Sequence, residues 1–314
     1  MRVLILLLAA GLGLSQAQPA PAPAAPPPGT DIYLVSLPAG LAGMKDAKPV
    51  PVSNAPGYDN QPMFSPDGGR LLFAANRDGK QIDIYAFDRA SGRVSQLTQT
   101  AENENSPTFL PAGIGEPGGF SVVQTEPDRS QRLWRFDAAG KNPQLVLADV
   151  KPVGYHAWVE PDHLAMFILG QPATLQVARV ATGKAEVVAR DIGRSLHRVP
   201  GRRTVSFVQR EAVGFVQRES STAFTIKEVA IDTRQVTSLV ATVEGSTDRD
   251  YAWMPDGRTV VMSSGTKIFS WTRGGTGWTE VFDAAAFQLG AVSRLSVSPK
   301  GDAMAMVVAE PKRP

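Results

Sequence analysis

Few side chains in this sequence are able to carry out covalent or metal chemistry. The 314 residues include three histidines and no cysteine, which excludes disulfides, thiolate metal sites and a cysteine nucleophile. The sequence has no G-x-S-x-G elbow, no H-E-x-x-H motif, no P-loop and no G-x-G-x-x-G after a strand. His156 and His197 could approach each other, but two histidines without a placed carboxylate are a weak metal site. We therefore predict no catalytic residue, no metal and no cofactor.

Polar side chains that are suited to binding cluster a few residues before a series of proline-containing turns, and in one neighbouring hairpin. Such a mixture of carboxylates, amides, tyrosines and an arginine fits recognition of a polar ligand or a peptide. The alternative is that these loops are simply hydrophilic. The candidate binding residues are Asp59, Asn60, Asp78, Glu104, Asn105, Tyr155, His156, Asp250, Tyr251 and Arg294.

An internal repeat defines the elements that position these side chains. Its clearest copy, residues 62–98, has four β-prone runs separated by the turns Ser65–Gly68, Arg77–Lys80 and Ala90–Gly92. Asp-Gly between β-prone runs is a strong hairpin signal, so this copy predicts a four-stranded antiparallel meander. The turn proline recurs as Pro66, Pro111, Pro161, Pro200, Pro255 and Pro299. Four strands in about 47 residues, repeated six times, predict an all-β chain folded as a six-bladed β-propeller.

The sixth copy is incomplete and indicates how the propeller closes. After Pro299 the sequence has room for only one more strand, at residues 303–308. At the other end of the chain, Asp31–Leu37 matches the pattern of Asp83–Asp88, and residues 48–53 match the strand that follows. We therefore predict that N-terminal strands complete the last blade, which leaves no open edge in the ring.

The meander also predicts which residues share a face of the propeller. The proline turns lie on one face, here called the turn face, and the loops that lead into the inner strands lie on the opposite face, here called the mouth face. We expect the ten candidate residues to lie around the channel opening on the mouth face and to be largely solvated. A different group stands just before the turns and is expected in the cores between blades rather than in a ligand-stacking box. It consists of Phe64, Phe109, Trp158 and Trp253.

Both ends of the chain are predicted to lie outside the propeller, which spans residues 31–310. Residues 1–17 combine a positive start, a short apolar run and the small residues Ser15 and Ala17, which is typical of a secretory signal peptide cleaved after Ala17. Residues 18–30 contain six prolines and are expected to be an extended linker. Residues 311–314 form a short tail.

Charge and composition restrict the class of partner. Lys plus Arg is 32 and Asp plus Glu is 30, a balance that argues against a dedicated nucleic-acid-binding protein. The apolar run at the N-terminus is too short to span a bilayer comfortably. We expect an exported protein, periplasmic or secreted, that is monomeric, is not membrane-embedded and does not bind nucleic acid.

The repeat resembles a known family. Residues 58–68 (YDNQPMFSPDG), followed by Asn76–Gly79 and Asp83–Tyr85, are similar to the TolB-type β-propeller repeat, and Trp253–Gly257 repeats its core. The resemblance implies a six-bladed propeller, often periplasmic, that binds partners at one end of its channel. TolB itself carries an N-terminal α/β domain, whereas here a proline-rich linker precedes the repeat. Similar repeats also occur in serine peptidases and in oligogalacturonate lyases, so the fold alone does not give the function.

These observations favour one function and leave two alternatives open. The favoured function is an exported scaffold without enzymatic activity that binds a protein or another component of the cell envelope on the mouth face. The first alternative is a hydrolase or lyase that acts on a carbohydrate or lactone-like substrate in the channel, with a metal held by carboxylates. The second is a bare structural propeller.

Overall fold

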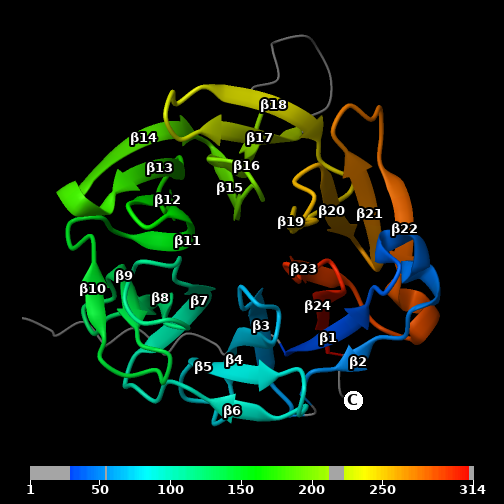
Figure 1. Cartoon of the computed structure of the whole chain (residues 1–314), viewed down its shortest axis with the longest axis horizontal. Helices are drawn as coiled ribbons and strands as arrows, with labels where there is room; N and C mark the ends of the chain where they lie inside the picture. Colours follow the sequence, from blue (N-terminus) through cyan, green and yellow to red (C-terminus); the bar gives the residue numbers. More distant parts are fainter. Residues whose placement is uncertain (1–28, 54, 212–222, 311–314) are drawn as a thin grey trace, which may run out of the picture.

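The computed structural model describes residues 29–53, 55–211 and 223–310. The predicted signal peptide, the linker up to residue 28 and the tail after residue 310 lie outside the described residues. Figure 1 looks down the axis of a ring of antiparallel sheets, in which β3, β7, β11, β15, β19 and β23 are the strands nearest the centre. The all-β propeller that the repeat predicts is confirmed.

Blades 1 to 3 each consist of four consecutive strands that pair in chain order. Blade 1 contains β3 (Tyr58–Phe64), β4 (Arg70–Asn76), β5 (Asp83–Asp88) and β6 (Val94–Gln96). Blade 2 contains β7 (Asn103–Phe109), β8 (Phe120–Thr125), β9 (Gln131–Phe136) and β10 (Gln144–Val146). Blade 3 contains β11 (Val153–Glu160), β12 (His163–Ile168), β13 (Thr174–Arg179) and β14 (Lys184–Arg190).

Blades 4 and 5 follow the same rule, and blade 6 combines the two ends of the chain. Blade 4 contains β15 (Ile192–Arg198), β16 (Thr204–Arg210), β17 (Phe224–Ala230) and β18 (Val236–Ala241). Blade 5 contains β19 (Tyr251–Trp253), β20 (Thr259–Ser264), β21 (Lys267–Thr272) and β22 (Thr279–Asp283). Blade 6 contains β23 (Val292–Val297), β24 (Ala303–Ala309), β1 (Thr30–Ser36) and β2 (Val50–Pro51). Short 3-10 helices are η1 (Gly40–Asp46), η2 (Val180–Thr182) and η3 (Ala284–Phe287).

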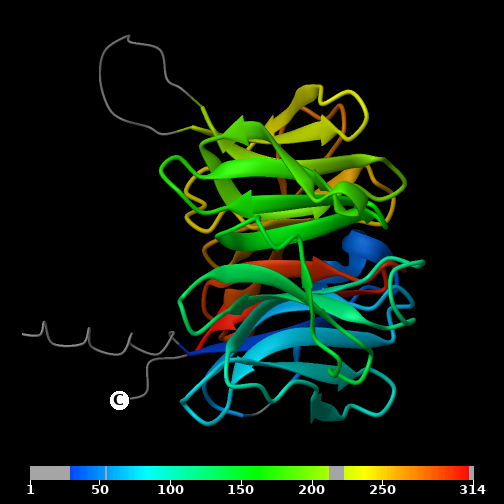
Figure 2. The same cartoon turned by 90° about the vertical axis from the view of Figure 1, so that its left-hand side faces the viewer.

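Blade 6 joins the N-terminal and C-terminal strands, as the sequence predicts. β1 pairs antiparallel with β24 over seven residue pairs, from Thr30 opposite Ala309 to Ser36 opposite Ala303, and β2 pairs with β1. In Figure 2 the blue strand β1 lies beside the red strands of the C-terminal end. β1 begins at Thr30, one residue before the predicted start of the propeller.

The hydrophobic core is divided among the interfaces between blades. Within the described residues, a cluster of buried side chains lies at every junction between neighbouring blades, including the junction of blade 6 with blade 1. The four anchor residues before the turns belong to these clusters, as expected. Phe64 is 4% exposed, Phe109 9%, Trp158 6% and Trp253 6%. Burial of this apolar area between blades is the main favourable term for the fold.

The turn that ends the inner strand of blade 5 lies close against blade 4. In blade 5, the Asp256 carboxylate accepts hydrogen bonds from the backbone N–H groups of Arg258 and Thr259, both at 2.8 Å. Gly257 has a φ of +61°, and a Cβ at this position would lie 2.4 Å from the carbonyl oxygen of Pro200 in blade 4. Glycine is therefore required at residue 257 both by its backbone conformation and by the close approach of two blades.

Candidate functional site

The inner strands carry an irregularity close to the mouth face. β3 changes register between Asn60 and Met63, and β7 changes register between Asn105 and Thr108. β11, β15 and β23 also change register near their starts. Gln61 and Ser106 adopt positive φ values of 57° and 54°, respectively, which are uncommon for residues other than glycine. Bulges of this kind redirect side chains, and they are over-represented next to functional sites.

Six polar side chains, one from each blade, meet at this level of the channel. Each stands three residues before the anchor position of its blade, which is occupied by Arg198 in blade 4 and by Val297 in blade 6. All six line a central cavity of about 540 Å³. We call this set the polar ring. It consists of Gln61, Ser106, Tyr155, Ser195, Asp250 and Arg294.

Hydrogen bonds connect members of the polar ring across blade boundaries. Arg294 donates from Nη2 to the Tyr155 hydroxyl at 2.6 Å, and its guanidinium lies 5.0 Å from the centre of the Tyr155 ring. The Ser195 hydroxyl donates to Asp250 Oδ1 at 2.8 Å, and the backbone N–H of Leu295 donates to Asp250 Oδ2 at 2.8 Å. The ring therefore ties blades 3 to 6 together and holds one arginine at the channel wall.

The charges along the channel are predominantly positive. The cavity is lined by Arg194, Arg198 and Arg294, whereas its lining includes one carboxylate, that of Asp250. His156 and His197 also line the cavity. Burial lowers the pKa of His156 to about 3 and also lowers the pKa of His197, so both imidazoles are neutral at pH 7. The channel therefore attracts anions more strongly than cations.

No protein-family model matches the sequence, but the fold is similar to that of several solved structures. The putative TolB from Agrobacterium tumefaciens aligns with a TM-score of 0.67 at 17% identity, and the alignment covers 90% of this chain and 98% of that one. TolB from Acinetobacter baumannii aligns with a TM-score of 0.55 at 14% identity, over 90% of this chain and 64% of that one. The fold is a TolB-like β-propeller.

The likeness extends to a protein of very different function. Kuenenia stuttgartiensis hydrazine synthase aligns with a TM-score of 0.56 at 13% identity, over 92% of this chain and 47% of that one. The TolB-like propeller is thus a scaffold on which function must be argued from the site itself.

No helix among the described residues has the length and apolar character needed to cross a membrane.

The structure divides the ten predicted site residues of the TolB-like propeller into two groups. Those that line the central cavity are Tyr155, His156, Asp250 and Arg294. Those that do not line it are Asp59, Asn60, Asp78, Glu104, Asn105 and Tyr251. The expectation that the candidate residues are largely solvated is wrong for six of them. Asp59, Asn60, Glu104, His156, Asp250 and Tyr251 are at most 8% exposed. The reason is that the blades converge most closely near the axis, where polar side chains fill the space between sheets.

Two of the buried predicted residues stabilise the junction of blades 6 and 1. The Asp59 carboxylate forms an ion pair with Arg77 at 2.6 Å and accepts a hydrogen bond from the Ser53 hydroxyl at 2.8 Å. Burial raises the pKa of Asp59, against the opposing effect of Arg77. Asn60 donates to the Thr30 hydroxyl at 3.3 Å. These contacts account for both side chains without a ligand.

Glu104 lies between blades 1 and 2, fully buried. It accepts hydrogen bonds from the Thr98 hydroxyl at 2.9 Å and from the Thr100 hydroxyl. Burial, with a contribution from nearby Asp83, raises the pKa of Glu104 to about 7. Asn105 is half-buried beside it.

Tyr251 and Asp78 occupy opposite environments. Tyr251 is fully buried in the cluster between blades 4 and 5, and its hydroxyl donates to Ser206 at 2.8 Å. Burial raises its pKa. The sequence predicts that Tyr251 contacts a ligand at the channel opening, but its ring is buried in the core between blades 4 and 5. Asp78 is exposed at the β4–β5 hairpin, where it accepts a hydrogen bond from the Lys80 backbone at 2.9 Å.

The two channel histidines do not form a metal site with a third ligand. His156 Nε2 lies 2.7 Å from the Ser121 hydroxyl, and His197 packs against the Tyr251 ring with centroids 4.7 Å apart. Across the described parts of the chain, no three His, Asp or Glu side chains are placed together so that they could hold a metal ion. The hydrolase or lyase alternative stays an untested hypothesis.

Sequence reasoning missed four residues of the channel. Gln61, Ser106 and Ser195 belong to the polar ring, and Arg194 lies next to it, paired with Asp248 at 2.7 Å. A signal for the ring exists in the sequence, because its members recur three residues before the anchor position. The signal is not apparent when the copies are aligned on the turn proline, because in the third copy the anchor Trp158 is displaced by one residue relative to that proline.

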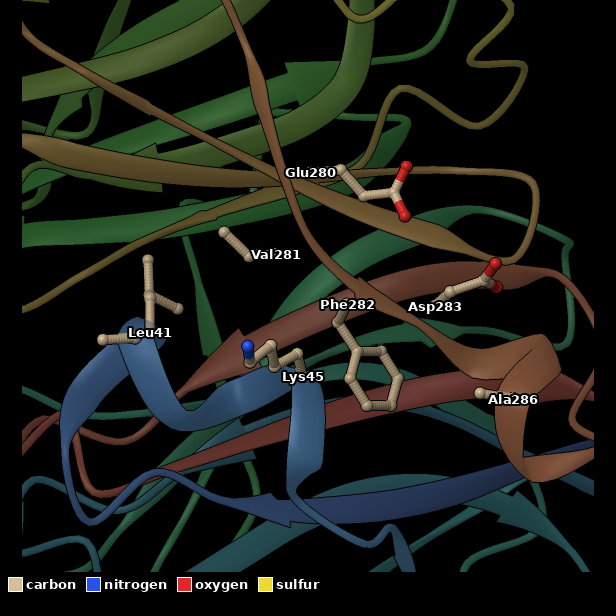
Figure 3. A pocket seen from close by; sticks show the side chains of 8 residues that line it. Leu41, Lys45, Glu280, Val281, Phe282, Asp283 and Ala286 are labelled. Atoms are coloured by element: carbon tan, nitrogen blue, oxygen red, sulfur yellow. The ribbon is translucent and has the colours of Figure 1, made fainter.

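A second hollow lies on the outside of the molecule, between η1 and β22. Figure 3 shows Leu41 and Lys45 from η1 on one side and Glu280 and Phe282 from β22 on the other. None of the predicted site residues lines this hollow. The channel is therefore the place where the candidate residues and the cavity coincide.

Proposed function

We propose that this TolB-like propeller is an exported binding scaffold that captures a protein or another cell-envelope component at the channel opening on its mouth face. The observation that carries the proposal is the polar ring, in which one polar residue from each blade lines the same cavity. Loops and irregular strand ends on a rigid scaffold are where binding residues are usually found. The rigid blades fix the ring, so little ordering entropy is lost when a ligand binds.

The residues proposed to contact the partner are those that remain accessible at this opening. Tyr155 is half-buried, and the Arg194 side chain is 34% exposed. Gln61 is also half-buried, and Asp78 is exposed at the outer part of the same face. Buried members such as Asp250 act instead by holding the ring in place.

Site-specific photocrosslinking in the native cell envelope tests which face binds. The photoreactive residue p-benzoylphenylalanine is introduced at Tyr155 or Asp78 on the mouth face, and at Asp67 or Asp256 on the turn face. We expect the same adduct from both mouth-face positions and none from the turn-face positions. Adducts from the turn face alone would mean that the opposite end of the channel is the binding end.

Export is tested separately by N-terminal sequencing of the mature protein. The first residue is expected to be Gln18, because the short apolar run ends in the small residues Ser15 and Ala17. An intact Met1 in a membrane fraction would contradict export as a free protein.

A further inference from the structure

Arg294 carries a buried charge that the protein satisfies incompletely. Its side chain is only 12% exposed. Of the five N–H donors of a guanidinium, one is used within the described residues, in the bond to the Tyr155 hydroxyl. Buried arginines are normally paired through several charge-assisted hydrogen bonds. The remaining donors of Arg294 are therefore available to an acceptor in the cavity.

The nearby carboxylate does not fill this role. Asp250 Oδ1 lies 3.9 Å from Arg294 Nη1, which is beyond hydrogen-bond distance. Both Asp250 oxygens already accept short bonds, one from Ser195 and one from the backbone of Leu295. Asp250 thus positions β23 and offsets part of the charge, but it leaves the guanidinium fork unoccupied.

The other groups that face Arg294 do not supply an anion either. Tyr155 is its hydrogen-bond acceptor, and Tyr58 is a near neighbour whose pKa burial raises to about 12. Arg194 adds a second positive charge at this level, although Asp248 pairs with it at 2.7 Å. The neutral histidines add no charge. A ligand with a negative group would complete the site.

The remainder of the cavity indicates the character of the ligand beyond that group. Below the polar ring, the wall is formed by Met63, Ala157, Leu196 and Ala252 together with the polar side chains of Thr108, His197 and Ser296, and the cavity ends at the prolines of the turn face. Its volume of about 540 Å³ lies in the range of small-molecule pockets. An anionic head and a compact, partly apolar body match this arrangement.

We propose that the channel binds a carboxylate group, held by the guanidinium of Arg294 in a bidentate arrangement, with the apolar part of the ligand directed toward the turn face. A planar carboxylate matches the fork of an arginine in geometry as well as charge. The proposal rests on the proposed function and specifies the chemistry of that site. The carboxylate belongs either to a small organic acid or to an acidic side chain that a partner inserts.

The probe for this site is 4-bromobenzoate, and 4-bromobenzamide is its neutral counterpart. Binding to the full mature protein is measured by titration calorimetry at low ionic strength. We expect the carboxylate to bind about tenfold or more tightly than the amide, because charge-assisted hydrogen bonds are lost with the amide. In a crystal soaked with the carboxylate, the bromine anomalous signal is expected in the channel below Arg294. Equal affinity for the two probes, or bromine outside the channel, would overturn the proposal.

Three variants locate the contact. Arg294→Gln is expected to weaken 4-bromobenzoate binding about tenfold or more, and Arg294→Lys less, since the charge stays but the fork is lost. Arg202→Gln, an exposed arginine outside the cavity, is the matched control and is expected to bind as the wild type does. Arg198→Gln tests the other end of the channel. Loss of binding with Arg198→Gln but not with Arg294→Gln would overturn the assignment. The soaked wild-type crystal decides the matter if an Arg294 variant fails to fold.

A second pair of probes distinguishes the two sources of the carboxylate. The peptides acetyl-Ala-Glu-Ala-amide and acetyl-Ala-Gln-Ala-amide differ only in the acidic side chain. Preference for the glutamate peptide, lost in Arg294→Gln, supports insertion by a partner, whereas binding of 4-bromobenzoate alone supports a small organic acid. If mouth-face crosslinks form but neither carboxylate is preferred, the binding function stands and the carboxylate proposal fails. If carboxylates bind but mouth-face adducts do not form, the scaffold function fails instead.

Discussion

Replacing Glu104 with glutamine is expected to stabilise the propeller above pH 7. Glu104 is fully buried between blades 1 and 2, and burial raises its pKa from 4.5 to about 7. Its neighbours are the Thr98 and Thr100 hydroxyls and the carboxyl of Asp83. Glutamine has nearly the same shape and keeps an acceptor for the hydroxyls, but it carries no charge.

The sign and size follow from proton linkage. The folded state holds a proton on Glu104 more tightly than the unfolded state, so this group is most favourable to folding below pH 4.5. The contribution is lost as the pH rises from about 4.5 to about 7, and it stays lost above that pH. A shift from 4.5 to about 7 corresponds to about 3 kcal/mol. Imperfect hydrogen bonding of the amide offsets part of this, which leaves a gain of about 2 kcal/mol at pH 8.

Urea unfolding at several pH values from 4 to 8 measures the effect. The difference in the free energy of unfolding between Glu104→Gln and the wild type is expected to be small at pH 4, to grow between pH 4.5 and 7, and to level off by pH 8. Taking the difference cancels the contributions of carboxylates that do not interact with Glu104, a group that excludes Asp83. Glu102→Gln, which removes the half-buried carboxylate just before β7 and leaves Glu104 in place, is the matched control. A difference that does not vary with pH, or a loss of stability at pH 8, would refute the reasoning.

Two further predictions concern the packing between blades. Trp253→Ala is expected to lower the free energy of unfolding by about 3–5 kcal/mol, since it empties a buried volume between blades 4 and 5; a loss below about 1 kcal/mol in denaturant melts would show that the anchor is not part of the core. Gly257→Ala is expected to cost about 2–4 kcal/mol, from its φ of +61° together with the clash with the Pro200 carbonyl. Gly201 has a similar φ of +71°, but a Cβ added there would meet no other atom. Gly201→Ala therefore measures the cost of the backbone conformation alone, expected to be about 1 kcal/mol. Equal losses of stability in the two glycine variants would show that the close approach of the blades is unimportant.

The blades could be predicted from sequence because local rules determine them. The turn Ser65–Gly68 and the Asp-Gly hairpin before β5 are encoded by residues within four positions of each other, so the strands of blade 1 begin close to the predicted residues. Completion of blade 6 by β1 was also predictable. The sixth copy of the repeat is incomplete at the C-terminal end, and the N-terminal end carries a segment with the pattern of a blade strand. Pairing the two ends in one blade is the arrangement that leaves no unpaired edge.

The site was predictable only in part, because the direction of a side chain on an inner strand depends on register. A shift of one residue turns a side chain from one face of its blade to the other, and the bulges at Gln61 and Ser106 introduce such a shift. The sequence placed Asp59 and Tyr251 near the opening, and the structure directs them to an ion pair and to the core, respectively.

The sequence by itself determined the repeat, the number of blades, the anchors between them and the pairing of the two ends of the chain. These features follow from turn chemistry and from the alternation of apolar residues, which act over a few residues. Only the tertiary structure decided which polar residues meet at the axis, how deeply they are buried and which charge remains unpaired. Those properties depend on distances between side chains from different blades, such as the 3.9 Å between Arg294 and Asp250, and residues so far apart in the chain meet only when the ring assembles.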